Sequence, residues 1–159
     1  MGLEVDLDLF LRRASISDEQ VLLSWANDHD VRSMARNSDP ITPETHSAWF
    51  TQRLADPNCR IWICEAPHGP VGQIRLVRSA DMAEIDISVS SDVRGQGVAT
   101  FMLSAPVITD WSGLRELVAV VRRGNLGSRA LFQKAGFVIS REDDEFVYFN
   151  KGARRVQTR

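Results

Sequence analysis

Residues 89–99 constrain the fold of this chain more than any other stretch. They read Val-Ser-Ser-Asp-Val-Arg-Gly-Gln-Gly-Val-Ala, so a β-rich run ends in a glycine-bearing turn that opens a helix near Gln96. Gly95 and Gly97 have no side chains, and the helix start directs unsatisfied N–H groups and the positive end of its dipole to the same place. A diphosphate would fit there. A tight strand-to-helix turn also needs glycine, so the turn alone leaves both interpretations open.

The overall composition predicts one domain. The chain has 159 residues, of which 43% are hydrophobic and 25% are charged. That is enough for one well-formed core and too little for two ordinary domains, so we expect a single domain over residues 1–159 with a frayed tail at about 153–159.

Charge and hydropathy exclude several function classes. A formal net charge of -2 gives no general attraction to nucleic acid or to an anionic membrane. The N-terminus does not pair a basic segment with an apolar stretch, and no run of about 18 apolar residues occurs. Cys59 and Cys64 have no His or Cys companions at metal spacing. We therefore predict a cytoplasmic protein with no metal, no nucleic-acid partner and no membrane association.

The first third of the chain predicts one strand followed by two helices. Residues 9–13 form the strand, and Ser17 with Gln20 resembles a capping box at the start of a helix that continues to Val31. Thr42 is a plausible N-cap and Pro43 suits the first helical position, so a second helix is expected from there to Leu54.

The remainder predicts a sheet interrupted by two helices. The strand at 83–90 alternates, with Glu84, Asp86 and Ser88 on one face and apolar residues on the other. Pro106 is expected to kink or split the helix that precedes it, and Gly136 to end the later one. The expected elements are strands at 60–66, 71–78, 83–90 and 116–122, helices at 96–111 and 125–135, and a hairpin of 137–140 with 145–150.

Two motifs in order resemble a known superfamily. Residues 94–99 read Arg-Gly-Gln-Gly-Val-Ala, and residues 125–137 follow as Asn-x-x-Ser-x-Ala-x-Phe-x-Lys-Ala-Gly-Phe. This pair resembles the GCN5-related N-acetyltransferase (GNAT) superfamily. The resemblance implies an α/β (α+β) fold: a mixed, mostly antiparallel sheet of six to seven strands, flanked by about four helices and splayed between strands 4 and 5. It also implies acetyl-CoA as co-substrate and a small-molecule amine as acceptor.

The resemblance also implies which residues bind acetyl-CoA. Backbone amides of the glycine loop would cradle the diphosphate, the backbone of Val89 would meet the pantetheine where the strands part, and Asn125 would bond the pantetheine arm. The implied residues are Val89, Arg94, Gly95, Gln96, Gly97, Val98, Ala99, Asn125, Ser128 and Phe132.

One position departs from the superfamily pattern. Many members carry a tyrosine that protonates the leaving thiolate, whereas this chain has Phe132, which has no proton to give. Tyr148 is the single tyrosine and falls on a late predicted strand. Ser128 or a water molecule is therefore the candidate acid.

The acceptor amine must lose a proton before it attacks. A carboxylate beside the thioester could accept that proton directly or through water, which makes Glu84 and Asp86 candidate bases. The backbone N–H near Val89 could polarise the carbonyl. The competing interpretation of both carboxylates is a solvated strand face.

A second resemblance concerns the acceptor. Trp-x-Asn-Asp-x-x-Val-Arg at 25–32, Asn-Ser at 37–38, Ile41 and His-x-x-Trp-Phe at 46–50 look like the enzymes that acetylate the 4-amino group of a UDP-linked deoxy amino sugar. The first portion is also similar to enzymes that acetylate protein N-termini or aminoglycosides. The residues implied to bind the acceptor are Asn27, Arg32, Asn37, His46 and Trp49.

These acceptor residues have ordinary structural interpretations as well. His46 could be a base or a helix-packing residue, and Trp49 could be a sugar platform or part of the core. The Asn and Arg positions could form a capped helix end and a solvated loop.

Three functions remain open from the sequence. The leading one is direct acetyl transfer to a nucleotide-linked amino sugar, since neither cysteine has a nucleophile setting. The second keeps acetyl-CoA and acts on a protein N-terminus or another small amine. The third is a CoA-binding regulatory module without catalysis, which Phe132 supports. A homodimer is compatible with all three.

Overall fold

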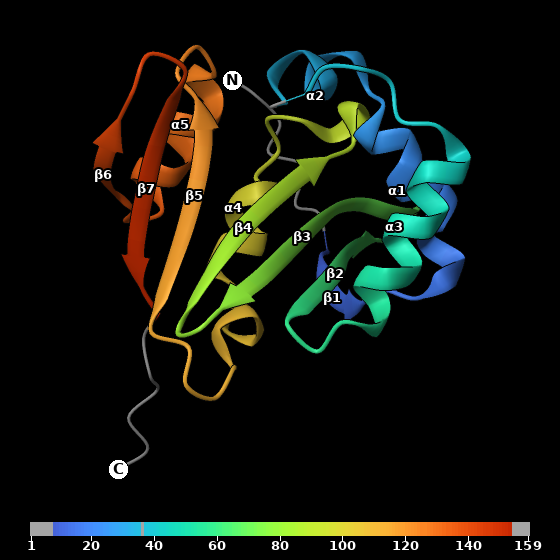
Figure 1. The fold of residues 1–159 in the computed structure, drawn as a ribbon. Helices are drawn as coiled ribbons and strands as arrows, with labels where there is room; N and C mark the ends of the chain where they lie inside the picture. The colour runs from blue at the N-terminus through green and yellow to red at the C-terminus, as the bar shows by residue number, and fades with distance from the viewer. Residues whose placement is uncertain (1–7, 36, 154–159) are drawn as a thin grey trace.

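The computed structural model describes residues 8–35 and 37–153, so most of the expected C-terminal tail lies outside the described residues. Seven strands form one sheet in the order β1-β2-β3-β4-β5-β7-β6 (Figure 1). Every neighbouring pair is antiparallel except β4 and β5, which are parallel. The strands are β1 Phe10–Arg13, β2 Cys59–Ala66, β3 Gly69–Ser79, β4 Met82–Val89, β5 Glu116–Arg122, β6 Val138–Glu142 and β7 Phe146–Gly152.

The parallel pair is short, and this opens the sheet. β4 and β5 are in register only from Met82 with Glu116 to Glu84 with Val118. Beyond those residues the two strands diverge, as Figure 1 shows between the green and the orange strand. The expected fold class, including the splay between strands 4 and 5, is confirmed.

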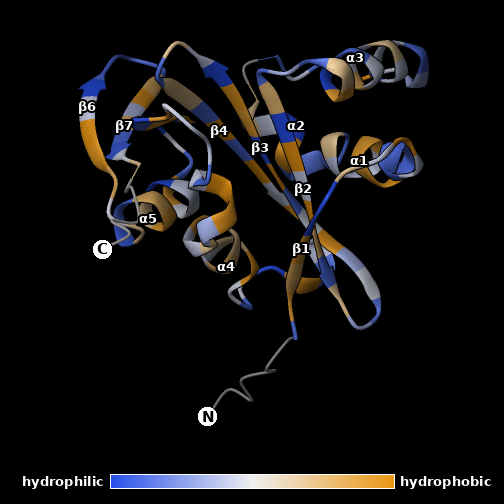
Figure 2. Ribbon diagram, turned by 90° about the horizontal axis from the view of Figure 1, so that it is seen from below, coloured by the Kyte–Doolittle hydropathy of each residue, from blue (hydrophilic) through white to orange (hydrophobic). Residues whose placement is uncertain are grey.

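Helices cover both faces of the sheet. Figure 2 shows α1 and α3 on one face and α4 and α5 on the other. Short 3-10 turns precede α1, follow β4 and follow α4. The helices are α1 Glu19–Ala26, α2 His29–Met34, α3 Pro43–Ala55, α4 Val98–Ser104 and α5 Leu126–Lys134, and the 3-10 turns are Ile16–Asp18, Ser91–Val93 and Pro106–Thr109.

Strand β2 contributes to both hydrophobic cores because both of its faces are covered. Its alternation sends Trp62 and Cys64 into the core beneath α4 and α5. Ile61 and Ile63 point the other way, into a smaller core with residues of α1 and α3 that include Phe50. Both cores are apolar, and together they hold hydrophobic side chains of β1 to β5 and β7 and of α1, α3, α4 and α5.

Several local signals in the sequence are confirmed. The Thr42 hydroxyl accepts a hydrogen bond from Thr45 N–H, with Pro43 in the first turn of α3. Asn125 caps α5, and Gly136 follows the helix with a φ of +93°. Pro106 begins a separate 3-10 turn, so α4 ends at Ser104. These signals act within a few residues, where side chain and backbone alone decide the conformation.

The long helix expected up to Val31 is interrupted. Asn27 ends α1, and the Asp28 carboxylate then accepts from the N–H groups of Asp30 and Val31, which starts α2 as a separate helix. The capping box lies two residues earlier than expected, at the 3-10 turn that leads into α1, where Ser15 N–H donates to Asp18. In both places an aspartate accepts from backbone N–H groups that have no acceptor within a helix.

Gly72 of β3 is packed so tightly that we expect any side chain there to destabilise the fold. A Cβ at this position would lie 2.9 Å from the Ser88 carbonyl oxygen and 3.1 Å from Met102 Cε. Gly72→Ala should lower the free energy of unfolding by about 1–3 kcal/mol, measured by urea denaturation. Gly124→Ala is the matched control, because a Cβ at Gly124 would meet nothing within 4 Å. Equal stabilities of the two variants would contradict the close packing.

Candidate active site

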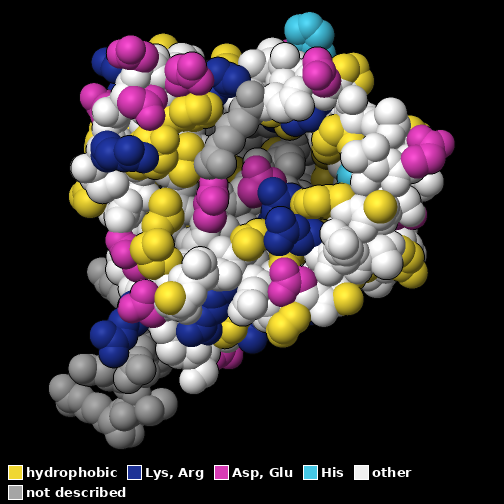
Figure 3. All heavy atoms as spheres, in the orientation of Figure 1, with side chains coloured by type: hydrophobic (Ala, Val, Ile, Leu, Met, Phe, Trp, Pro, Cys, Tyr) yellow, Lys and Arg dark blue, Asp and Glu magenta, His cyan; other side chains and the backbone are white. Residues whose placement is uncertain are grey.

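The diverging strands β4 and β5 border a cleft of about 1900 Å³. Figure 3 shows the centre of this face hollowed, with acidic and basic side chains around the hollow. The lining comes from α1, α2, α3, β2, β3, β4, the loop after β4, α4, the end of β5 and α5. All ten residues that the sequence assigned to acetyl-CoA line this cleft.

The glycine loop at one end of the cleft presents bare backbone. Gly95 and Gly97 have φ values of +78° and +84°, which L side chains rarely adopt, and a Cβ on either would meet no atom within 4 Å. Phe101 N–H donates to the Gly97 carbonyl at 2.9 Å as α4 begins. The N–H groups of the first three helical residues therefore have no acceptor within the helix. This arrangement fits a diphosphate.

The open edge of β4 also presents backbone groups. Ser90 N–H donates to the Val71 carbonyl at 2.8 Å, and hydrogen-bonded residues alternate along an antiparallel pair. By that alternation Ile87 and Val89 direct their N–H and C=O groups away from β3, toward the space left by β5. An extended ligand rich in amides can bond there as an added strand would.

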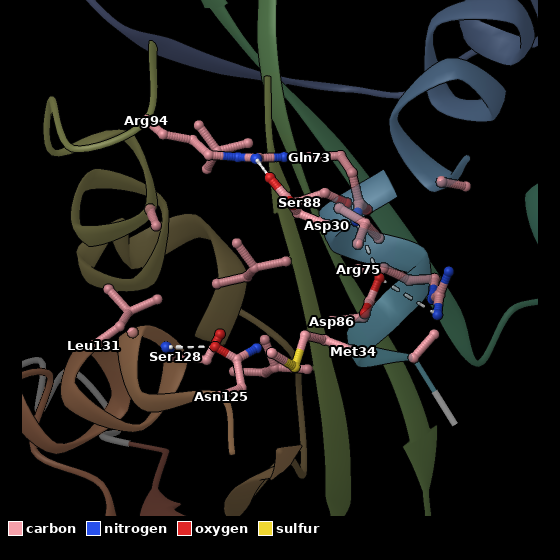
Figure 4. Close-up of a pocket in the computed structure, with 18 of the residues that line it drawn as sticks. Asp30, Met34, Gln73, Arg75, Asp86, Ser88, Arg94, Asn125, Ser128 and Leu131 are labelled. Carbon is pink, nitrogen blue, oxygen red and sulfur yellow. Dashed lines mark hydrogen bonds and ion pairs between the residues drawn. The ribbon is translucent and has the colours of Figure 1, made fainter. Parts of the chain in front are cut away.

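Asn125 caps α5 with one side of its amide. Its Oδ1 accepts from Ser128 N–H at 3.2 Å, and in Figure 4 the amide nitrogen lies on the side of the cleft toward β4. The nitrogen is a hydrogen-bond donor, so Asn125 can cap the helix and bond a ligand at once.

Phe132 is a core residue as well as part of the cleft wall. It is 5% exposed, and its ring lies 5.1 Å from Phe137 and 5.9 Å from Phe149. Tyr148 is not among the residues that line the cleft, and its hydroxyl donates to Asp143 at 3.2 Å. Among the described residues, the hydroxyl groups in the lining belong to Ser33, Thr45, Ser88, Thr100 and Ser128.

A polar cluster on β3 and β4 lines the cleft. Gln73 is 5% exposed, and its Nε2 donates to Asp86 Oδ2 at 3.0 Å and to Ser88 Oγ at 2.8 Å (Figure 4). Arg75 Nη2 lies 3.5 Å from the same Asp86 oxygen, and its guanidinium sits 4.8 Å from the Trp49 ring. Asp86 is therefore held by two neighbours while its side chain remains 53% exposed.

The two candidate bases differ in position. Asp86 lines the cleft, whereas Glu84 is absent from the lining and sits opposite Val118, where β4 and β5 are still paired. The strand alternation that places both on one face was predicted correctly, but the split begins only after Glu84.

His46 is buried behind the cleft. It is 3% exposed, its ring lies 5.6 Å from Trp49 and 5.8 Å from Phe50, and its Nδ1 has no hydrogen-bond partner among the described residues. Burial lowers the pKa of His46 from its ordinary value of 6.5, and the charge of Glu19 acts weakly in the opposite direction. The imidazole is thus held in its neutral form.

The structure separates the five residues implied to bind the acceptor. Arg32, His46 and Trp49 line the cleft. The Asn27 amide is bonded to both backbone groups of Ile41, each at 2.8 Å. Asn37 accepts from Asp39 N–H at 2.9 Å. Neither Asn27 nor Asn37 belongs to the lining.

Sequence reasoning did not single out several further cleft residues, among them Gln73, Arg75, Met34 and Arg122. Gln73 carried a detectable signal, because it is a polar residue inside an apolar strand. Met34 gave no signal. Arg122 gave none either, because its partner, the Ala35 carbonyl, lies 87 residues away in the sequence.

Residues 8–138 match the protein family described as "Acetyltransferase (GNAT) domain". The chain belongs to the GNAT acetyltransferase family. It is 32% identical over 89 residues to "Acetyltransferase Pat" of Mycolicibacterium smegmatis, a match covering 52% of this chain and 27% of that protein. It is 28% identical over 136 residues to "Putative phosphinothricin acetyltransferase YwnH" of Bacillus subtilis, covering 80% and 82%. The matched stretch thus spans about a quarter of one relative and most of the other.

Solved structures share the fold. The spermidine N-acetyltransferase of Vibrio cholerae in complex with CoA and spermine has a TM-score of 0.78 at 16% identity, over 91% of this chain and 95% of that one. A putative phosphinothricin N-acetyltransferase has a TM-score of 0.78 at 24% identity, over 93% and 100%. These solved structures share the GNAT fold with this chain, and the family match over residues 8–138 shows the acetyltransferase class of enzyme.

Within residues 8–35 and 37–153, no group of three or more His, Cys, Asp and Glu residues could hold a metal ion. No helix in the same part of the chain is long and apolar enough to cross a membrane. Cys59 and Cys64 are both buried, and burial raises the pKa of the Cys64 thiol to about 11. Neither thiol is disposed to ionise at neutral pH.

The buried His46 should make the protein less stable in acid. Because its pKa is lower in the folded than in the unfolded chain, the unfolded chain binds more protons below about pH 6.5, and stability falls as the pH drops through the folded pKa. His46→Gln removes this contribution. Between pH 7 and pH 5, the free energy of unfolding should fall more for the wild type than for the variant. Urea denaturation at both pH values measures this difference, which should correspond to the uptake of at most one proton on unfolding. A difference that is constant with pH would contradict the lowered pKa.

Proposed function

We propose that this protein is an acetyl-CoA-dependent N-acetyltransferase that acts on a small primary amine bearing an anionic group. Transfer is direct, within a complex that holds both substrates. The observation that carries the proposal is the split between β4 and β5, which joins the glycine loop at one end to Asp86 on the acceptor face.

The cleft suits acetyl-CoA along its length. The glycine loop and the start of α4 offer N–H groups to the diphosphate, the free edge of β4 offers backbone groups to the pantetheine amides, and Asn125 offers its Nδ2. The acetyl thioester then lies toward Asp86 and Ser88, which directs the reactive carbonyl to the polar cluster.

Asp86 is the proposed base. Acetyl-CoA supplies an acetyl thioester, so the amine forms a C–N bond as the C–S bond breaks, and the departing thiolate takes up a proton. Asp86 accepts the proton of the ammonium group, directly or through water. The N–H of Val89 polarises the carbonyl. Ser128 or a water at that end of the cleft protonates the sulfur, because Phe132 offers no proton.

The charge of the cleft selects among acceptors. Five basic side chains line it, Arg32, Arg75, Arg94, Arg122 and Lys134, against Asp30 and Asp86 in the lining and Asp28, which is paired with Arg94. Such a lining attracts an anionic acceptor and disfavours a polycation such as a polyamine. This difference favours the nucleotide-linked amino sugar that the N-terminal motif resembles, and Trp49 offers a ring face to its sugar or base.

A second acceptor class is also supported. A compact amino acid with an acidic side group satisfies the same charge balance, and two of the relatives are described as putative phosphinothricin acetyltransferases. Such an acceptor would pair its carboxylate with Arg75 and its amine with Asp86. A protein N-terminus carries no fixed anion and is the weaker candidate.

Asp86→Asn should lower turnover about 100-fold or more at neutral pH, with partial recovery at higher pH, where the amine deprotonates without help. Glu84→Gln is the matched control, since Glu84 lies on the same strand face outside the cleft lining. Initial rates of CoA release between pH 6 and pH 9.5 test this. Equal losses of turnover in both variants would show that Asp86 is not the base. A turnover of Asp86→Asn that does not recover with rising pH would show the same.

Asn125→Asp should weaken acetyl-CoA binding about tenfold while leaving the fold intact. The aspartate keeps the oxygen that caps α5 and replaces the donor nitrogen with a second acceptor. Titration calorimetry gives the affinity, and the urea midpoint reports the cap. If the folded variant bound acetyl-CoA with unchanged affinity, Asn125 would not be a ligand of acetyl-CoA.

The acceptor is tested by comparing acetyl-CoA consumption with a UDP-linked 4-amino sugar, phosphinothricin, spermidine and a peptide with a free N-terminus. We expect kcat/KM to be highest for one of the two anionic small molecules. Highest turnover of spermidine or of the peptide would overturn the charge argument. Acetyl-CoA binding with a stoichiometry near one but no CoA release with any amine would support the non-catalytic module instead.

A further inference from the structure

Helix α2 lies beside the open end of the split without a hydrophobic anchor. It has six residues, His29–Met34, and none of them is buried. Isolated helices this short are unstable in water, and helices in proteins are normally held by an apolar face. Other interactions must hold α2 where Figure 1 shows it, near the end of β4.

One such interaction fastens the start of α2. Arg94, in the glycine loop after β4, places Nη2 at 2.9 Å from Asp28 Oδ1 and Nη1 at 2.9 Å from Asp30 Oδ2. Asp28 is also the N-cap of α2. The hydrogen bond from Arg94 holds the pKa of Asp28 below its ordinary value. The guanidinium thus ties the diphosphate loop to the first turn of α2.

A second interaction fastens the other end. Arg122 is the last residue of β5, and its Nε and Nη2 donate to the Ala35 carbonyl at 2.9 and 2.7 Å. Ala35 is the C-cap residue of α2, where helix carbonyls lack partners. The two arginines come from opposite sides of the split, one from the end of β4 and one from β5.

Between these two attachments α2 forms part of the cleft wall. Residues 30–35 all line the cleft. Figure 4 shows the Met34 side chain extending from α2 toward the side of the cleft that carries Asn125. The position of α2 therefore decides how much space an acceptor has next to Asp86.

We propose that Arg94 and Arg122 are positioning residues that hold α2 across the split and thereby set acceptor binding. This inference rests on the proposed function. It assigns the two parts of Arg94 to different substrates: the backbone of its loop serves acetyl-CoA, while its side chain serves the acceptor. The competing role for the guanidinium is a counter-ion for the diphosphate, in which case its loss would weaken acetyl-CoA binding directly.

The first test removes the attachment from either side. Arg94→Gln abolishes the ion pairs, and the double variant Asp28→Asn with Asp30→Asn removes the carboxylate charges while asparagine still caps the helix. Asp144→Asn is the surface control, because Asp144 is exposed and lies outside the cleft lining. Hydrogen exchange of residues 28–35 is measured without substrates, so it reports on α2 whether or not the enzyme turns over.

We expect faster exchange in α2, an acceptor KM raised about tenfold and an acetyl-CoA affinity within about twofold of wild type. Combining all three substitutions should add little to Arg94→Gln alone, because the partners are shared. Arg122→Gln should likewise raise the acceptor KM while leaving the acetyl-CoA affinity nearly unchanged. High salt should raise the acceptor KM of wild type more than that of Arg94→Gln, since exposed ion pairs are screened.

Two results would overturn the proposal. One is a loss of acetyl-CoA affinity in Arg94→Gln with α2 exchange unchanged, which would make the side chain a diphosphate ligand. The other is unchanged exchange and unchanged acceptor KM in all variants, which would leave the contacts without a role. Failure of the proposed function has a different signature, namely no acetyl transfer to any amine by the wild-type enzyme.

Discussion

The short parallel pairing of β4 with β5 is the constraint on which the rest of this structure depends. Three residues of each strand are in register, and then the strands part. Beyond Glu84, the backbone groups of β4 that face β5 are left available for a ligand, as at any unpaired strand edge. The glycine loop and α4 follow directly from β4, and Asn125 follows β5 within a few residues, so the residues proposed to bind acetyl-CoA are brought together by the strands that create the gap.

The split also explains why two carboxylates on one strand face have different surroundings. Glu84 stands where the sheet is closed, and Asp86 stands two residues further, beside the cleft and within reach of Gln73 and Arg75. Strand alternation gives both the same direction but does not say where pairing ends. The point at which pairing stops, a tertiary property, determines which carboxylate lies beside the cleft.

The sequence predicts the parts of this molecule that depend on neighbouring residues. The cap at Thr42, the break at Pro106, the glycine loop and the Asn125 helix were each readable because one side chain acts on backbone within one turn. The interactions that the sequence did not reveal join distant segments. The Asn27 amide spans 14 residues to Ile41, and Arg94 reaches 66 residues back to Asp28. The resemblance of the N-terminal motif therefore predicted that Asn27 binds the acceptor. It could not show that the Asn27 amide is already hydrogen-bonded to Ile41.

The difference between local interactions and interactions of distant segments also affects how a member of a family acquires a particular substrate. The side of the cleft proposed for acetyl-CoA is built from backbone groups and from glycines with positive φ, which depend little on other side chains. The side proposed for the acceptor is built from side chains that hold one another: Gln73 on Asp86, Arg75 against Trp49, and two arginines on α2. Changing any one of them moves its partners. The donor site can thus remain the same among relatives while the acceptor site diverges, which is why shared fold at low identity leaves the acceptor to be decided by the charges and contacts of this chain.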